Sequence, residues 1–274
     1  MDVCRGVSLK AWWLAAMLAA AVLPVEAAQT IKVAAADFPP YVLKPESGEV
    51  DGILPQLLTA LNEVQQDYRF VIRPTAIPRR FRDFQDGRID LAIFENPDWG
   101  WHGIPGARID LGLEDVEIFV ARAEPGRGQE YFKALGGKRL ALYNGYHYGF
   151  AGFNPDPDYL QRAFNARLTY SHDSNLRMVL RGRADIALVT RSYFNRYLEQ
   201  NPDQAGSFLA SDRVDQHYHH YALLRPDAPI SAERFRTLLE SLRGDGRLER
   251  IFSRYGVVVR PTGRGSSAAT GAQD

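Results

Sequence analysis

Aromatic and charged residues gather where a predicted buried strand ends. The run Ile31–Ala36 is apolar enough for a strand covered on both faces, and it stops at Asp37–Tyr41, "DFPPY". The two prolines fix the backbone of this turn, so its rings are held in place before any ligand arrives. Ligands of open α/β sheets bind beyond the carboxyl ends of the strands. The ligand-contacting residues predicted in this turn are Asp37, Phe38 and Tyr41.

Similar residues follow two further predicted strands. "RIDLAIF" (Arg88–Phe94) leads into "ENPDWGWHG", and "GKRLALYNG" (Gly137–Gly145) leads into "YHY". Aromatic rings hold flat or cationic groups by stacking and cation–π attraction, and a carboxylate suits a ligand amine. The candidates in these two stretches are Glu95, Trp99, Trp101, Tyr143, Tyr146 and His147.

No motif identifies a catalytic or metal centre. The sequence contains neither a Gly-x-Ser-x-Gly elbow nor a His-Glu-x-x-His zinc motif. His217, His219 and His220 look like a metal cluster, but alternation along a strand puts His220 on the opposite face from the other two. We therefore predict no metal, no cofactor and no enzymatic activity. Acid–base chemistry by Glu95, His102 and His147 remains an alternative.

The N-terminal segment predicts an exported protein, and the composition gives no sign of a nucleic-acid partner. The 274 residues carry 33 basic and 33 acidic side chains, so no global field favours nucleic acid. A short basic start, the apolar run "AWWLAAMLAAAVL" and small residues after it predict a cleaved signal peptide over residues 1–27, with an uncleaved anchor as the alternative. Cleavage removes Cys4, the only cysteine. The small polar segment 259–274 is predicted to be disordered.

The rest of the chain alternates short apolar runs with helical periodicity, which predicts an α/β fold with mostly parallel strands. The pattern restarts near Gly137. "GRID" (Gly87–Asp90) and "GRAD" (Gly182–Asp185) each join a predicted helix to a buried strand. These equivalent entries predict two similar halves.

The sequence resembles the bacterial extracellular solute-binding proteins of family 3, the polar-amino-acid-type receptors of ABC importers. The stretches that carry the resemblance are "VAAADFPPYV", "GILPQLLTAL", the two Gly-x-x-Asp entries, "RIDLG" at Arg108–Gly112 and "SLRGDGRLERIFSRYG". It implies the type II periplasmic-binding-protein fold, with two α/β lobes joined by two crossing strands near Ala121–Pro125 and Tyr218–Leu223. Lobe 1 would comprise residues 28–121 and 223–258, and lobe 2 residues 122–222.

The resemblance also implies a role. A periplasmic monomer of this family captures a small polar solute by hinge closure and presents it to a membrane ABC permease. Two alternatives stay open, namely a ligand sensor for a membrane regulator and an enzyme similar to the cyclohexadienyl dehydratases that share this fold.

The sequence departs from the family at the ligand clamps. Amino-acid receptors use an arginine after the strand that ends here at Phe94 and a carboxylate at the end of a second-lobe strand. This chain has no arginine between Phe94 and Arg108, and Thr190 stands at the second position. We predict that Arg79 meets a ligand acid, while Arg80 and Arg82 lie on a solvated helix face. The expected ligand is amino-acid-like without being a simple α-amino acid, and Thr190 completes its predicted contacts.

Overall fold

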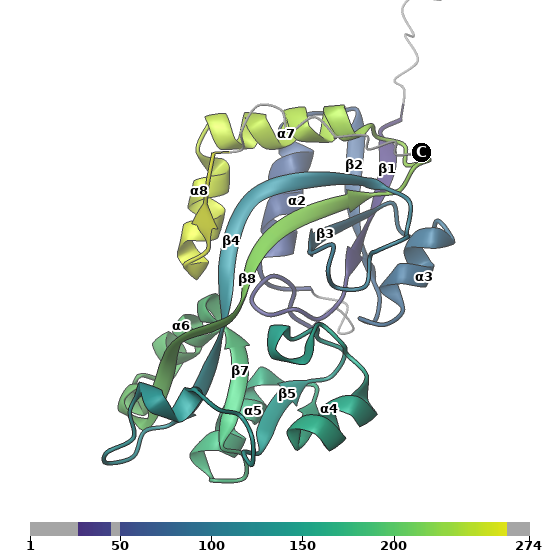
Figure 1. The fold of residues 1–274 in the computed structure, drawn as a ribbon. Coiled ribbons are helices and arrows are strands. Elements are labelled where there is room, and N and C mark those ends of the chain that lie inside the picture. Colours follow the sequence, from purple (N-terminus) through teal and green to yellow (C-terminus); the bar gives the residue numbers. More distant parts are fainter. Residues whose placement is uncertain (1–26, 45–49, 262–274) are drawn as a thin grey trace, which may run out of the picture.

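The computed structural model describes residues 27–44 and 50–261, which form two α/β lobes joined by a pair of long strands (Figure 1). Apart from its last residue, the predicted signal peptide lies outside these residues, as does the predicted tail beyond Pro261, so both remain predictions. Across the described ranges, every helix is too short or too polar to cross a bilayer.

The first lobe is built on three parallel strands. β1 pairs in parallel with both β2 and β3. Ile53, Leu54, Leu57, Leu58 and Leu61 are buried at the helical spacing that gives α2 one apolar face toward the core. The elements of this lobe are β1 (Gln29–Ala35), α2 (Ile53–Glu63), β2 (Tyr68–Pro74), α3 (Arg80–Gln85), β3 (Leu91–Glu95), α7 (Ala232–Gly244), α8 (Arg247–Phe252) and β9 (Val258–Val259).

The second lobe repeats this plan with the middle of the chain. β5 pairs in parallel with β6 and β7, and α5 packs against β5. The elements of this lobe are β5 (Leu140–Tyr143), α4 (Pro157–Phe164), β6 (Ala166–Thr169), α5 (His172–Leu180), β7 (Ile186–Thr190) and α6 (Arg191–Gln200).

Two long antiparallel strands, β4 (Ala107–Arg122) and β8 (Phe208–Leu224), run through both lobes. They link the strands of the described residues into one nine-stranded sheet of order β2-β1-β3-β8-β4-β7-β5-β6, with β9 paired to β4. Figure 1 shows the pair curving from the upper lobe into the lower one. The predicted α/β fold with two lobes and two crossing strands is therefore confirmed.

The strands change lobes earlier on β4 than predicted. Leu113 packs in the first-lobe core, whereas Ile118, Phe119 and Ala121 pack in the second-lobe core. The crossing on β4 thus falls between Leu113 and Ile118 rather than near Ala121–Pro125, so residues 118–121 pack with the second lobe. The other predicted domain limits remain a prediction.

The two Gly-x-x-Asp entries have one physical explanation. Asp90 accepts a hydrogen bond from the Lys32 backbone N–H at 2.9 Å, and Asp185 accepts one from the Arg139 backbone N–H at 2.7 Å. Each aspartate therefore connects the start of its strand by a hydrogen bond to the backbone of the neighbouring parallel strand. Gly87 and Gly182 follow α3 and α5 with φ of 69° and 64°, the left-handed conformation that ends a helix at glycine.

Candidate functional site

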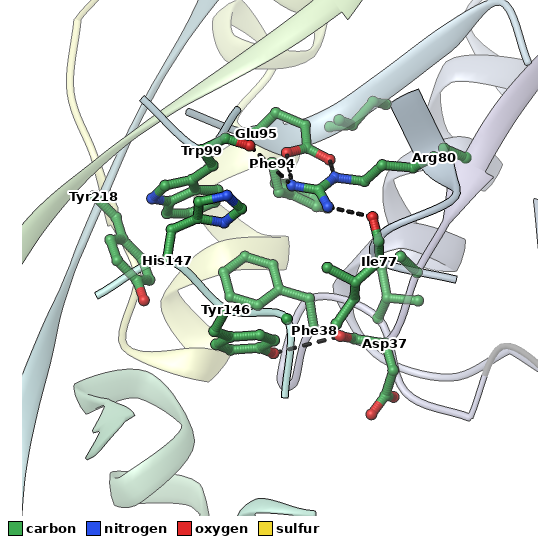
Figure 2. Close-up of a pocket in the computed structure, with 15 residues that line it drawn as sticks. Asp37, Phe38, Ile77, Arg80, Phe94, Glu95, Trp99, Tyr146, His147 and Tyr218 are labelled. Atoms are coloured by element: carbon green, nitrogen blue, oxygen red, sulfur yellow. Dashed lines mark hydrogen bonds and ion pairs between the residues drawn. The ribbon is translucent and has the colours of Figure 1, made fainter. Parts of the chain in front are cut away.

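A cavity lies between the lobes, at the carboxyl ends of β1 and β3 (Figure 2). Its empty space, part of which opens to solvent, is about 590 Å³. A wider space, about 1530 Å³ with the open solvent included, continues outward from it and shares several of its walls. Of the predicted residues, the inner cavity is lined by Asp37, Phe38, Glu95, Trp99, Tyr146 and His147, and the outer space additionally by Tyr143.

The turn after β1 presents one ring to the cavity and supports it with another. Backbone hydrogen bonds of 2.9 Å in both directions between Phe38 and Val42 close the turn. The Phe38 ring stacks on Tyr41 at 4.8 Å between centroids and meets the Tyr146 ring edge-on at 5.6 Å. Tyr41 is fully buried behind Phe38 and does not line the cavity, contrary to our expectation.

Besides Asp37, the charged residues of the cavity are Arg80 and Glu95, which form a buried ion pair. Arg80 Nε lies 2.8 Å from Glu95 Oε1, and the two side chains are 5% and 11% exposed. The guanidinium also donates to the backbone carbonyls of Ile77 and Trp99. Arg80 lines the cavity (Figure 2), so the prediction that it lies on a solvated helix face is wrong.

Arg79 lies outside the cavity. It directly precedes α3 without making a side-chain capping hydrogen bond, its side chain is 61% exposed, and its Nε pairs with Asp83 Oδ1 at 3.2 Å. The structure therefore does not bring Arg79 to the place where a ligand acid was expected. Arg82, with its side chain 81% exposed, is on the solvated face as predicted.

The two tryptophans have different positions. Trp99 lines the cavity, and its Nε1 donates to Gln216 Oε1 at 3.0 Å. Trp101 lies behind the cavity, where it packs edge-on against Phe81 and Phe84 and donates from Nε1 to Glu95 Oε2 at 2.8 Å. Trp101 therefore positions the Glu95 carboxylate instead of lining the cavity.

The second lobe closes the cavity with the turn after β5. Tyr143 and Tyr146 stack at 4.5 Å between centroids. The Tyr143 hydroxyl donates to the Asp37 carboxylate, and the Tyr146 hydroxyl donates to the Asp37 carbonyl oxygen at 3.4 Å. These contacts join the two lobes across the cleft.

His147 lines the cavity as a neutral ring at pH 7. Burial and, to a smaller extent, the Arg80 charge lower the pKa of His147 to about 4. A neutral imidazole offers one hydrogen-bond donor and one acceptor, so His147 provides hydrogen bonding without adding a positive charge beside Arg80.

Comparison with solved structures identifies the fold. An ancestral arginine-binding protein bound to arginine is 17% identical, covers 84% of this chain and 99% of its own, and gives a TM-score of 0.63. A substrate-binding protein of an ABC uptake transporter from Streptococcus pneumoniae with bound histidine gives 0.65, at 19% identity over 82% of this chain and 92% of its own. The chain has the two-lobed periplasmic-binding-protein fold.

A histidine kinase sensor domain with similarity to periplasmic binding proteins also matches, at 21% identity over 85% of this chain and 99% of its own, with a TM-score of 0.61. No protein-family model matches the sequence, and no curated protein sequence does. At these identities the likeness establishes the periplasmic-binding-protein fold and leaves the family resemblance as a prediction.

Thr190 has a structural position in this periplasmic-binding-protein fold. It is fully buried at the end of β7, where its hydroxyl accepts a hydrogen bond from the Tyr193 N–H at 3.2 Å and so caps α6. Thr190 does not line the cavity.

The three residues of the acid–base alternative do not come together in the cavity. His102 is 69% exposed, pairs with Asp98 and does not line the cavity with Glu95 and His147. Among the described residues, no group of three or more His, Cys, Asp or Glu is arranged to hold a metal ion.

Several cavity residues were missed by the sequence prediction. They are Ala34, Ala36, Val42, Ile77, Arg80, Ile93, Phe94, Gly145 and Tyr218. Two of them left a signal in the sequence. Arg80 is four residues from the buried Phe84 and so lies on the same face of α3. Along β8 the buried Tyr218 and His220 alternate with the exposed His217 and His219, so the side chains of Tyr218 and His220 lie on the same inward face.

Proposed function

We propose that this protein captures a small polar solute by closing its two lobes around it. The observation that carries the proposal is the interlobe cavity, whose walls come from both lobes and hold a buried ion pair among aromatic rings. A cavity that is mostly apolar, with a few converging polar groups, is typical of a small-molecule site. The matched proteins that hold arginine or histidine have this fold, which supports the proposal.

The walls favour a ligand with a flat or cationic body. Phe38, Trp99, Tyr146 and Tyr218 offer ring surface. The ion pair adds no net formal charge, because the Arg80 guanidinium and the Glu95 carboxylate neutralise each other. The Asp37 carboxylate also lines the cavity. A ligand acid would have to share Arg80 with Glu95. The proposed ligands are therefore amines and modified or aromatic amino acids, in preference to simple α-amino acids.

We further propose that the protein acts in the periplasm as a monomer and presents its ligand to a membrane ABC permease. The similarity to the binding protein of an ABC uptake transporter supports this role. The similarity to a histidine kinase sensor domain supports a second candidate, a sensor that passes ligand binding to a membrane regulator. The proposed function includes no catalysis.

The proposal is tested on protein exported to the periplasm and purified without refolding. Native mass spectrometry should show a small molecule bound in one-to-one stoichiometry, and adding that compound should raise the melting temperature of stripped protein. Absence of any retained compound, together with no thermal shift across amines, amino acids and small carboxylates, would overturn the proposal. Multiple-turnover conversion of a bound compound would replace it with an enzymatic function.

Replacing Tyr146 with alanine should weaken ligand binding by about 1–3 kcal/mol, which is roughly 5- to 150-fold in Kd, because a buried aromatic wall is lost. Tyr146 lines the cavity and is 7% exposed. Tyr159→Ala is the matched control, since Tyr159 is 36% exposed on α4 of the same lobe. Titration calorimetry with the retained compound measures both, and equal affinities for the two variants would contradict the assignment.

A further inference from the structure

A buried glutamine on β8 connects cavity residues of both lobes. Gln216 is 7% exposed. Its Oε1 accepts from Trp99 Nε1 of the first lobe at 3.0 Å, and its Nε2 donates to the His147 carbonyl oxygen of the second lobe at 2.7 Å. The Nε2 also donates to Glu117 Oε2 on β4 at 2.7 Å. With these partners only one orientation of the amide satisfies all three contacts.

A buried aspartate on β4 makes the same kind of connection. Asp115 is 8% exposed. Its Oδ2 accepts from the Tyr41 hydroxyl of the first lobe at 3.0 Å and from the hydroxyl of Ser192, which lies in the first turn of α6 in the second lobe. Tyr41 in turn stacks on the cavity ring of Phe38.

The two side chains share a position in the fold. β4 and β8 are the strands that cross between the lobes, and Asp115 and Gln216 lie beside the residues at which the core changes lobe. Each has one partner that belongs to the first lobe and one that belongs to the second. Rotation of the lobes about these strands would separate those partners, leaving buried polar groups without hydrogen bonds unless water replaced them.

We propose that Gln216 and Asp115 are positioning residues that hold the lobes closed and thereby set the affinity of the cavity. The equilibrium between open and closed lobes can be measured without knowing the ligand. Its effect on ligand affinity rests on the proposed function. Each bridge comprises hydrogen bonds to both lobes, and a bond of this kind contributes about 0.5–1.5 kcal/mol. Together they favour the closed arrangement through hydrogen bonds that involve no ligand atom.

The test measures the distance between the lobes in ligand-free protein. Arg82 and Asp158 are exposed and belong to α3 and α4, helices of opposite lobes (Figure 1), so spin labels at Arg82→Cys and Asp158→Cys report opening. The labels are placed in the chain carrying Cys4→Ser, which removes the only native cysteine. The variants are Gln216→Leu, Asp115→Asn and both together.

Gln65→Leu is the matched control, because Gln65 also makes three hydrogen bonds through its amide but all of them within the first lobe. We expect one short distance in the parent protein and a longer, broader distribution in Gln216→Leu, with the ratio of open to closed protein raised roughly tenfold. The double variant should open further, and Gln65→Leu should keep the parent distribution even if its melting temperature falls.

Two results would overturn the proposal. One is an open ligand-free parent protein, and the other is a folded Gln216→Leu, Asp115→Asn double variant, by circular dichroism, with the parent distance distribution. Neither result depends on finding a ligand, so failure of this proposal and failure of the proposed function are separately visible.

Discussion

Replacing Arg80 with alanine should lower the free energy of unfolding by about 3–5 kcal/mol, because it leaves a buried carboxylate without its charged partner. Glu95 is 8% exposed and receives two hydrogen bonds from Arg80, at 2.8 and 3.3 Å. The Trp101 Nε1 also donates to Glu95, at 2.8 Å, and this hydrogen bond remains in the variant. Urea denaturation followed by circular dichroism measures the loss.

The neighbouring arginine provides the control. Arg79 pairs with Asp83 from a side chain that is 61% exposed, and an exposed pair of this kind contributes about 0–1 kcal/mol. Arg79→Ala should therefore leave the unfolding curve nearly unchanged. An Arg79→Ala variant that loses more stability than Arg80→Ala would contradict the burial on which the site is built.

A double variant separates charge from packing. Arg80→Met with Glu95→Gln removes both charges and keeps an acceptor for Trp101 Nε1. Replacing a buried ion pair by uncharged groups of similar volume is often neutral, so the double variant should recover most of the stability lost in Arg80→Ala. It should still bind ligand weakly if the pair contacts the ligand. Equal losses in the single and double variants would show that packing around Arg80, rather than an unpaired charge, determines its effect.

The fold was predictable because its signals repeat along the chain. Buried strands, amphipathic helices and the two Gly-x-x-Asp entries occur in both lobes, and the aspartates make the same contact with a neighbouring strand in each. The order of these local patterns was enough to identify the architecture. The crossing point on β4 was missed because Phe119 and Ala121 look the same in sequence whichever lobe they pack in.

The site was predictable only as a set of strand ends. Sequence identifies which residues follow a strand, and the cavity indeed gathers Asp37, Glu95 and Tyr146 from three such places. For two adjacent side chains it gives only a weak indication of which one faces inward, here the four-residue spacing between Arg80 and Phe84. α3 has six residues, too few for a clear apolar period, so its phase is set by packing of Phe84 and Asp83, which turns Arg80 inward and Arg79 outward.

Supporting residues were mistaken for contacts for a related reason. Tyr41, Trp101 and Thr190 stand in the correct segments, but each is used by the protein itself, as a partner of Asp115, as a donor to Glu95 and as a helix cap. A residue that contacts the ligand and one that positions such a residue have the same chemistry in sequence.

Acidification should destabilise the protein through two buried histidines, with the largest effect below pH 6.5. His172 is 2% exposed and His220 is 0% exposed, so both rings are shielded from water. Burial lowers the pKa of each from 6.5 to about 3. Between these values the unfolded chain binds protons that the folded chain does not, so each histidine lowers the free energy of unfolding by about 1.4 kcal/mol per pH unit as the pH falls.

Buried acids act in the opposite direction. Burial raises the pKa of Asp115, Glu117 and Asp215. Their contribution to stability is therefore lost as the pH rises through those raised values, and the pH curve of the parent protein is a sum of both effects. Differences between variants isolate the histidines, because the acids are common to all of them.

His220→Leu provides that difference. His220 packs against the rings of Tyr41 at 4.6 Å and Tyr218 at 5.6 Å, where leucine has a similar volume and no polar atoms to bury. The variant should match or exceed the parent in stability at pH 7, and its advantage should grow by about 1.4 kcal/mol for each pH unit below 6.5. Urea denaturation from pH 7.5 to pH 4.5 measures both proteins. Parallel curves for the parent and His220→Leu would mean that His220 binds protons equally in the folded and unfolded chain. That result would contradict the lowering of the His220 pKa by burial among aromatic rings.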